Sequence, residues 1–113
     1  MAASPLPAFR PPRLLRHAHV QASLASSGFR RERVERAAAA LTAASREEII
    51  ECGEGVRLQA FHTPPRGAPG RTVVLLHGWE GSARSVHVVS GAAALWARGF
   101  RVIRINMRAH GDT

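Results

Sequence analysis

The sequence of 113 residues contains one cysteine, no lysine and no tyrosine. Because Cys52 has no second cysteine to pair with, an internal disulfide and a cysteine-based zinc site are excluded. No apolar run approaches the roughly 20 residues that a membrane-spanning helix needs, and the N-terminus lacks the apolar core of a signal peptide. We therefore expect a soluble, cytoplasmic protein without a transmembrane segment, and no feature of the sequence indicates a cofactor.

The chain has a formal charge of +8, and all 16 of its basic residues are arginine. Such an excess is typical of proteins that bind nucleic acid or anionic membranes. These arginines, however, are scattered and are not interleaved with aromatic residues, as a single-strand binder requires. Abundant alanine and absent lysine fit a GC-rich coding bias. We therefore expect no nucleic-acid partner; the alternative is a small, basic, non-catalytic protein that contacts an acidic partner or RNA.

Residues 1–45 are expected to form an extended and helical N-terminal segment. Four prolines within residues 1–13 favour an extended path. A short helix is predicted for residues 14–24, and a longer one for residues 29–44, where strong helix formers dominate. Residues 1–31 hold arginine, serine and alanine but no acid, so an organellar transit peptide and a proline-rich surface segment both remain possible interpretations.

The next segment carries the pattern of a β-hairpin. Two partly alternating stretches, residues 47–52 and 56–62, are separated by Gly53-Glu54-Gly55, a sequence that favours a tight turn. The alternation is imperfect, which allows a bulge near the turn. The positions expected to point inward are Ile49, Cys52, Val56, Leu58, Ala60 and His62.

A β-α-β unit is predicted for the rest of the chain. The apolar run at residues 72–76 lacks alternation, which is typical of a strand of a parallel sheet that is buried on both faces. A helix-compatible segment, residues 85–98, leads to a second apolar run at residues 100–105. Both runs end in polar, glycine-bearing loops, residues 77–82 and 106–113. Loops at the carboxyl ends of parallel strands commonly carry binding and catalytic groups, so these two are the candidate functional loops.

Three separated motifs resemble one enzyme family. They are Leu15-Arg16-His17-Ala18-His19-Val20-Gln21, His77-Gly78-Trp79-Glu80-Gly81-Ser82 and Asn106-x-Arg108-x-His110-Gly111-Asp112-Thr113. In this order they resemble the YheT-like branch of the α/β-hydrolases, which comprises predicted hydrolases and esterases. The chain departs from the branch at Ala18 and Ala22, where proline and threonine are usual, and at Ala109, where an acidic residue is usual.

The resemblance implies a fold and a division of the chain. Residues 46–113 would be the N-terminal part of an α/β-hydrolase sheet, with an antiparallel hairpin followed by a parallel β-α-β unit, and residues 1–45 would precede it as helical segments. The family's Gly-x-Ser-x-Gly elbow, acid and histidine would lie further along the chain, because neither Ser82 nor Ser90 fits the elbow. We therefore expect this chain to be a portion of a serine carboxylesterase whose substrate is a small-molecule acyl ester. The portion should be inactive alone, because it lacks the triad. The oligomeric state is left open.

One catalytic element is expected within the chain. By resemblance, the backbone N–H of Trp79 would donate to the oxyanion formed during acyl transfer, and Gly78 would let the substrate oxygen approach the backbone. Gly78 and Trp79 are therefore the predicted substrate-binding residues. The alternative for Trp79 is an aromatic residue of the core or one that faces a lid.

The histidines and acids of the same loops are assigned structural roles. His77 is expected to orient its loop by hydrogen bonding, and His110 and Asp112 are expected to shape the second loop instead of forming a catalytic pair. The six histidines show no metal-binding spacing, so no metal is predicted.

Overall fold

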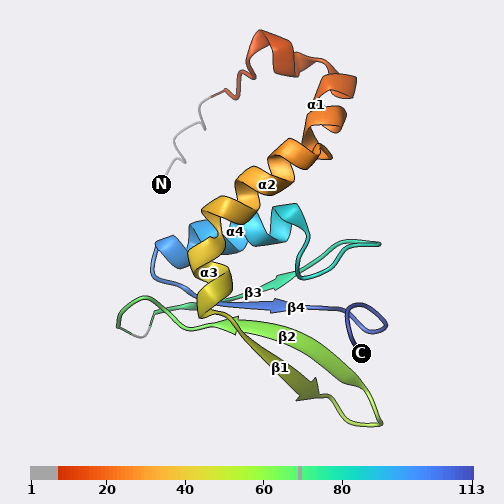
Figure 1. Cartoon of the computed structure of the whole chain (residues 1–113), viewed down its shortest axis with the longest axis vertical. Coiled ribbons are helices and arrows are strands. Elements are labelled where there is room, and N and C mark those ends of the chain that lie inside the picture. The colour runs from red at the N-terminus through yellow and green to blue at the C-terminus, as the bar shows by residue number, and fades with distance from the viewer. Residues whose placement is uncertain (1–7, 69) are drawn as a thin grey trace, which may run out of the picture.

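The computed structural model describes residues 8–68 and 70–113 and shows a mixed α/β fold (Figure 1). In chain order the elements are the 3₁₀-helix η1 (Arg13–Arg16), α1 (Ala18–Ala25), α2 (Gly28–Ala37), α3 (Ala39–Ala44), β1 (Arg46–Glu51), β2 (Arg57–Thr63), β3 (Thr72–Leu76), α4 (Val86–Ala97) and β4 (Arg101–Ile105). The strands form one sheet in the order β1-β2-β4-β3. Neighbours pair antiparallel except β3 and β4, which are parallel. The predicted fold class is confirmed.

The N-terminal helices are shorter than the sequence predicts. The helix expected at residues 14–24 is divided at His17, whose backbone is extended (φ −87°, ψ 124°). The helix expected at residues 29–44 is divided at Ala38 (φ −96°, ψ 5°). The change of direction at Ala38 lets both Ala38 and Leu41, each 1% exposed, pack against α4 and β4 in the core. Tertiary packing has overridden the helix propensity of the alanine run. The first part of the expected extended segment, residues 1–7, lies outside the described residues.

The predicted hairpin is confirmed, and its pairing is regular. The register runs without a bulge from Arg46 opposite His62 to Glu51 opposite Arg57. Residues 53–55 all have positive φ, which two glycines accommodate without steric cost.

The inward face predicted for the second strand of the hairpin, β2, is wrong. Val102 is fully buried under the helices and lies opposite Thr63, so Thr63, Phe61 and Gln59 share the helix-covered face of β2. Leu58, Ala60 and His62 therefore lie on the opposite face, where Ala60 is nevertheless buried (1% exposed). On β1, the predicted inward residue Ile49 lies opposite Gln59 and does share the helix-covered face. Because side chains alternate along a strand, an error of one position exchanges the two faces. Gln59 and Thr63 are polar, so the alternation of apolar residues assigned them to the solvent-exposed face. They are buried because distant residues supply their hydrogen bonds.

The β-α-β prediction is confirmed. Helix α4 begins after Ser85 and ends before Gly99, whose φ of +88° suits a glycine that stops a helix. Its inner side buries Val88, Val89, Ala92 and Trp96. The indole N–H of Trp96 donates to the carbonyl oxygen of Pro64 at 2.7 Å, which fixes the connector before β3 to the helix.

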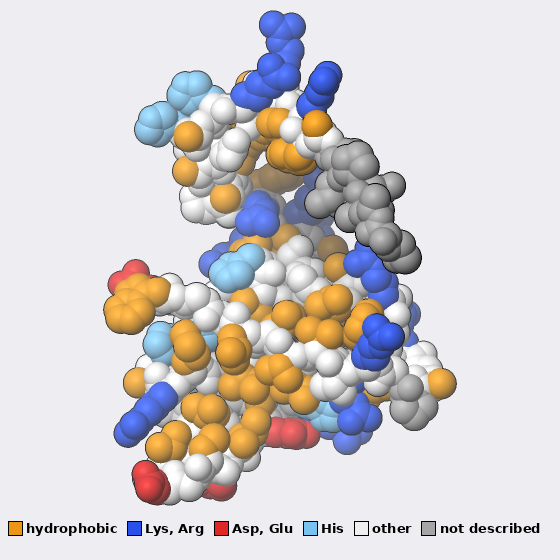
Figure 2. Space-filling model, turned by 180° about the vertical axis from the view of Figure 1, so that it is seen from behind, with side chains coloured by type: hydrophobic (Ala, Val, Ile, Leu, Met, Phe, Trp, Pro, Cys, Tyr) orange, Lys and Arg blue, Asp and Glu red, His pale blue; other side chains and the backbone are white. Residues whose placement is uncertain are grey.

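The expectation that the strand at residues 72–76 is buried on both faces is wrong for this chain. Helices α2, α3 and α4 lie on one face of the sheet only (Figure 1). On the other face Val74 is 52% exposed and Leu76 is 61% exposed, beside the half-buried Ile103 and Ile105. Figure 2 shows hydrophobic side chains gathered over this part of the molecule. Within the described residues, no strand pairs with the outer edge of β3. None of the described helices is long and apolar enough to cross a bilayer.

Two identical substitutions test this one-sided core. Leu41→Ala removes a fully buried side chain and should lower the free energy of unfolding by about 2–5 kcal/mol. Leu76→Ala removes an exposed one and should change it by no more than about 0.5 kcal/mol. Urea denaturation followed by circular dichroism measures both values. Equal losses would show that the outer face is covered in solution.

Candidate functional site

The two candidate loops leave the sheet side by side. Because β3 and β4 are parallel and Leu76 lies opposite Ile105, His77 and Asn106 emerge at the same edge. Figure 1 shows both loops at the carboxyl ends of these strands. This is the edge at which open α/β sheets place their binding sites.

His77 joins one loop to the other. The residue is 4% exposed, and its Nε2 accepts a hydrogen bond from the backbone N–H of Met107 at 3.0 Å. Nδ1 must then carry the proton, and it donates to the carbonyl oxygen of Gly78 at 2.8 Å. The ring also lies 4.7 Å from that of His110, centroid to centroid. Both nitrogens are engaged, so His77 has the hydrogen bonds that a loop-orienting role requires and no free nitrogen for proton transfer.

Trp79 lies at the tip of a tight turn. The N–H of Gly81 donates to the carbonyl oxygen of Gly78 at 3.0 Å, and Glu80, the third residue of the turn, has a φ of +57°. The side chain of Trp79 is 93% exposed, so the alternative of a core aromatic is wrong. The backbone N–H of Trp79 donates a hydrogen bond to no group among the described residues. A Cβ added at Gly78 would meet no atom within 4 Å, so packing does not require a glycine there.

A buried hydrogen-bond network holds both loops to β2. Asn106 is 2% exposed; its Oδ1 accepts from the N–H of Ala83 at 2.7 Å, and its Nδ2 donates to Gln59 Oε1 at 2.7 Å. Gln59 Nε2 in turn donates to Asp112 Oδ2 at 3.1 Å and to Glu47 Oε1 at 2.7 Å. The N–H of Asp112 also donates to Gln59 Oε1, at 3.2 Å. The two loops are therefore positioned by one connected set of side chains.

The network explains the roles of the second loop. Asp112 binds Gln59, whereas Nδ1 of His110 lies 3.0 Å from the carbonyl oxygen of Arg108. The two residues form no hydrogen bond with each other, as expected for loop-shaping residues. Sequence reasoning missed Gln59, and it placed Asn106 in a family motif and a candidate loop without predicting its buried hydrogen bonds.

The serines of this region are also engaged structurally. Ser85 Oγ accepts from the N–H of Ser82 at 2.9 Å, and Ser82 Oγ accepts from the N–H of Arg84 at 3.1 Å. Ser90 lies exposed on α4. None of the three is hydrogen-bonded to a histidine. In residues 8–68 and 70–113, no three His, Cys, Asp or Glu side chains gather as a metal site.

Comparison with known proteins shows what the fold resembles. No family model and no curated protein matches the sequence. A solved structure, described as an α/β serine hydrolase homologue from Coxiella burnetii, matches with a TM-score of 0.54 and 25% sequence identity. The match covers 60% of this chain and 34% of that protein, so the matched part spans about a third of its length. The chain therefore has a mixed α/β fold that resembles part of an α/β hydrolase.

Matched glycine substitutions test the network. Gly55 (φ +75°) and Gly111 (φ +69°) have the same backbone strain, so Gly→Ala at either should cost about 1–2 kcal/mol of stability. At Gly111 the added Cβ would also collide with Gln59 Oε1 and Asn106 Nδ2, which should cost about 1–3 kcal/mol more. Urea denaturation followed by tryptophan fluorescence compares the two variants. Equal losses would mean that the Gln59–Asn106 contact is absent in solution.

Proposed function

We propose that residues 46–113 are the first part of an α/β-fold serine hydrolase core of the YheT-like branch, and that residues 1–45 precede it as a helical segment. The completed enzyme would hydrolyse a carboxylic (acyl) ester of a small-molecule substrate. One observation carries the proposal: Trp79 is an exposed residue in the loop that follows a parallel strand, and its backbone N–H has no hydrogen-bond partner among the described residues. The structural likeness to a serine hydrolase homologue supports it.

The chemistry assigns a defined task to this N–H. A serine Oγ attacks the ester carbonyl carbon, its proton passes to a histidine, and the carbonyl oxygen becomes negatively charged. Two backbone N–H groups stabilise that oxygen, one after the nucleophile and one in the loop after the first parallel strand. Collapse of the intermediate releases the alcohol, and water then frees the acid. Such a donor contributes about 3 kcal/mol to the transition state; Trp79 would supply it, and Gly78 would leave room for the substrate oxygen.

The nucleophile, acid and base must come from residues outside this chain. The outer edge of β3, with which no strand of the described residues pairs, offers unpaired backbone groups for a further strand. Val74 and Leu76 offer an apolar face for a further layer. Both features support a core that is completed by more polypeptide.

The isolated chain should therefore be inactive. Assays with p-nitrophenyl acetate and butyrate should show no turnover above that of buffer, and a fluorophosphonate probe should label no serine, because no described serine is activated by a histidine. Turnover that the same phosphonate abolishes would show that the nucleophile lies within these residues.

Trp79 can be tested by removing its N–H alone. Proline is favoured at the second position of a turn whose third residue has positive φ, so Trp79→Pro should preserve the turn while deleting the donor. In a longer polypeptide that carries the elbow and triad, kcat/KM should fall about 10²–10³-fold.

The matched control is Trp79→Ala, which removes the side chain and keeps the N–H. We expect its kcat/KM to stay within about tenfold of the parent value. Circular dichroism checks that both variants are folded. Equal activity of the two variants would exclude Trp79 as the oxyanion donor. It would not contradict the hydrolase assignment, which fluorophosphonate labelling of the longer polypeptide tests separately.

A further inference from the structure

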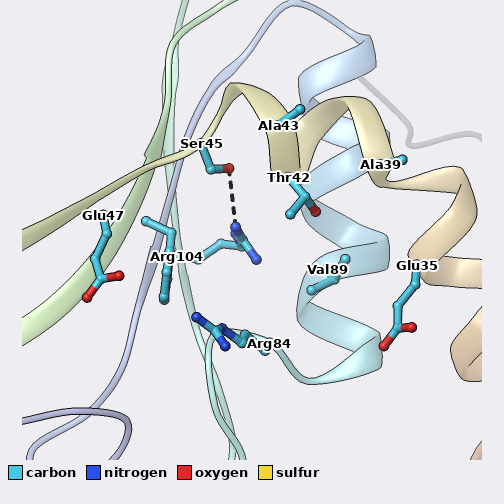
Figure 3. A pocket seen from close by; sticks show the side chains of 10 residues that line it. Glu35, Ala39, Thr42, Ala43, Ser45, Glu47, Arg84, Val89 and Arg104 are labelled. Atoms are coloured by element: carbon cyan, nitrogen blue, oxygen red, sulfur yellow. Dashed lines mark hydrogen bonds between the residues drawn. The ribbon is translucent and has the colours of Figure 1, made fainter.

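A second region of the molecule places two arginines beside a cavity. A pocket of about 810 Å³ lies between α3, α4 and the helix-covered face of the sheet, and Arg84 and Arg104 both line it (Figure 3). The guanidinium carbons of Arg84 and Arg104 lie 5.3 Å and 5.2 Å from the ring centroid of Phe61. Neither Gly78 nor Trp79 lines the pocket, so it is separate from the proposed oxyanion site.

Arg104 is a buried cation that forms no ion pair with an acidic residue in residues 8–68 and 70–113. It is 3% exposed; Nη1 donates to the carbonyl oxygen of Ala83 at 3.1 Å, and Nη2 donates to Ser45 Oγ at 3.2 Å. Its Nε has no hydrogen-bond partner among the described residues. Both of the acceptors are neutral, and a buried charge without a counter-charge is unfavourable. Burial lowers the pKa of Arg104, and the nearby charge of Arg84 lowers it further.

Other residues that line the pocket restrict the kind of anionic ligand that could bind between the two arginines. Val89 of α4 and the ring of Phe61 give it apolar walls. Two carboxylates lie at its edges, Glu35 and Glu47, and the latter already accepts a hydrogen bond from Gln59 at 2.7 Å. Their negative charge disfavours a multiply charged ligand such as a phosphate dianion. The volume is far larger than a single carboxylate group requires.

We propose that this pocket binds a small organic monocarboxylate with an apolar tail. The carboxylate lies between the guanidinium groups of Arg84 and Arg104, which supply charge-assisted hydrogen bonds, and the tail packs against Val89. The ligand provides the counter-charge that Arg104 lacks within the protein. This site does not depend on the proposed esterase function, because it uses none of the residues assigned to the oxyanion.

Equilibrium dialysis of the full chain with radiolabelled octanoate tests the proposal. We expect saturable binding of one octanoate per chain, which neither octan-1-ol nor inorganic phosphate displaces at equal concentration. Octanol has the same chain length without the charge, and phosphate has charge without the tail. Displacement by octanol as effective as that by unlabelled octanoate would overturn the proposal, because the arginines would then have no role.

Variants locate the bound molecule. Arg84→Ala should weaken binding about tenfold or more, the effect of losing a charge-assisted hydrogen bond. Arg84 is exposed, so its removal leaves no buried group unpaired. Arg98→Ala, at an exposed arginine after α4, is the matched control and should bind as the parent does.

The uncovered apolar face offers a competing location for octanoate. Leu76→Gln makes that face more polar and should leave the affinity unchanged. If Leu76→Gln abolishes binding and Arg84→Ala does not, octanoate occupies the outer face of the sheet and the proposal is wrong.

Discussion

The parallel pairing of β3 with β4 determines where the two candidate loops of this protein lie. Parallel strands deliver their following loops to one edge, and the loops bring backbone N–H and C=O groups that no strand can pair. Asn106 meets this requirement at the point of exit. Its amide binds the N–H of the buried Ala83 on one side and Gln59 on the other, so both loops are held to β2. The exposed turn at Trp79 rests on this buried support.

The residue that anchors the first loop and the residue that the loop exposes to solvent lie at different positions. His77 is buried and has both ring nitrogens engaged, whereas Trp79, two positions later, is almost fully exposed and its N–H has no partner in the part of the chain that the structure describes. A preorganised donor needs this combination, because a group that reorients when charge develops loses part of its effect. The proposed oxyanion role therefore depends less on Trp79 itself than on the residues that fix the turn.

The two faces of the sheet differ in what is left unsatisfied: a buried charge on the helix-covered face, and exposed apolar side chains on the outer face. Under the helices, Arg104 is buried among neutral acceptors, an arrangement that an anionic ligand would stabilise. On the outer face, Val74 and Leu76 remain in contact with solvent beside a free strand edge. Exposed apolar surface next to unpaired backbone is a typical place for a further strand to bind, and also for aggregation to begin.

Local patterns in the sequence were sufficient to predict the hairpin, helix α4 and the two parallel strands, because glycine turns and apolar runs act over a few residues. The site was only partly predictable: the sequence placed His77, Gly78 and Trp79 in one loop, but it did not indicate Gln59 as their indirect support. Gln59 meets Asp112 across 53 positions, and Arg104 meets Ser45 across 59. Only the tertiary structure decided those contacts, the break at Ala38 and the inward face of β2, since each depends on which distant groups share a buried space.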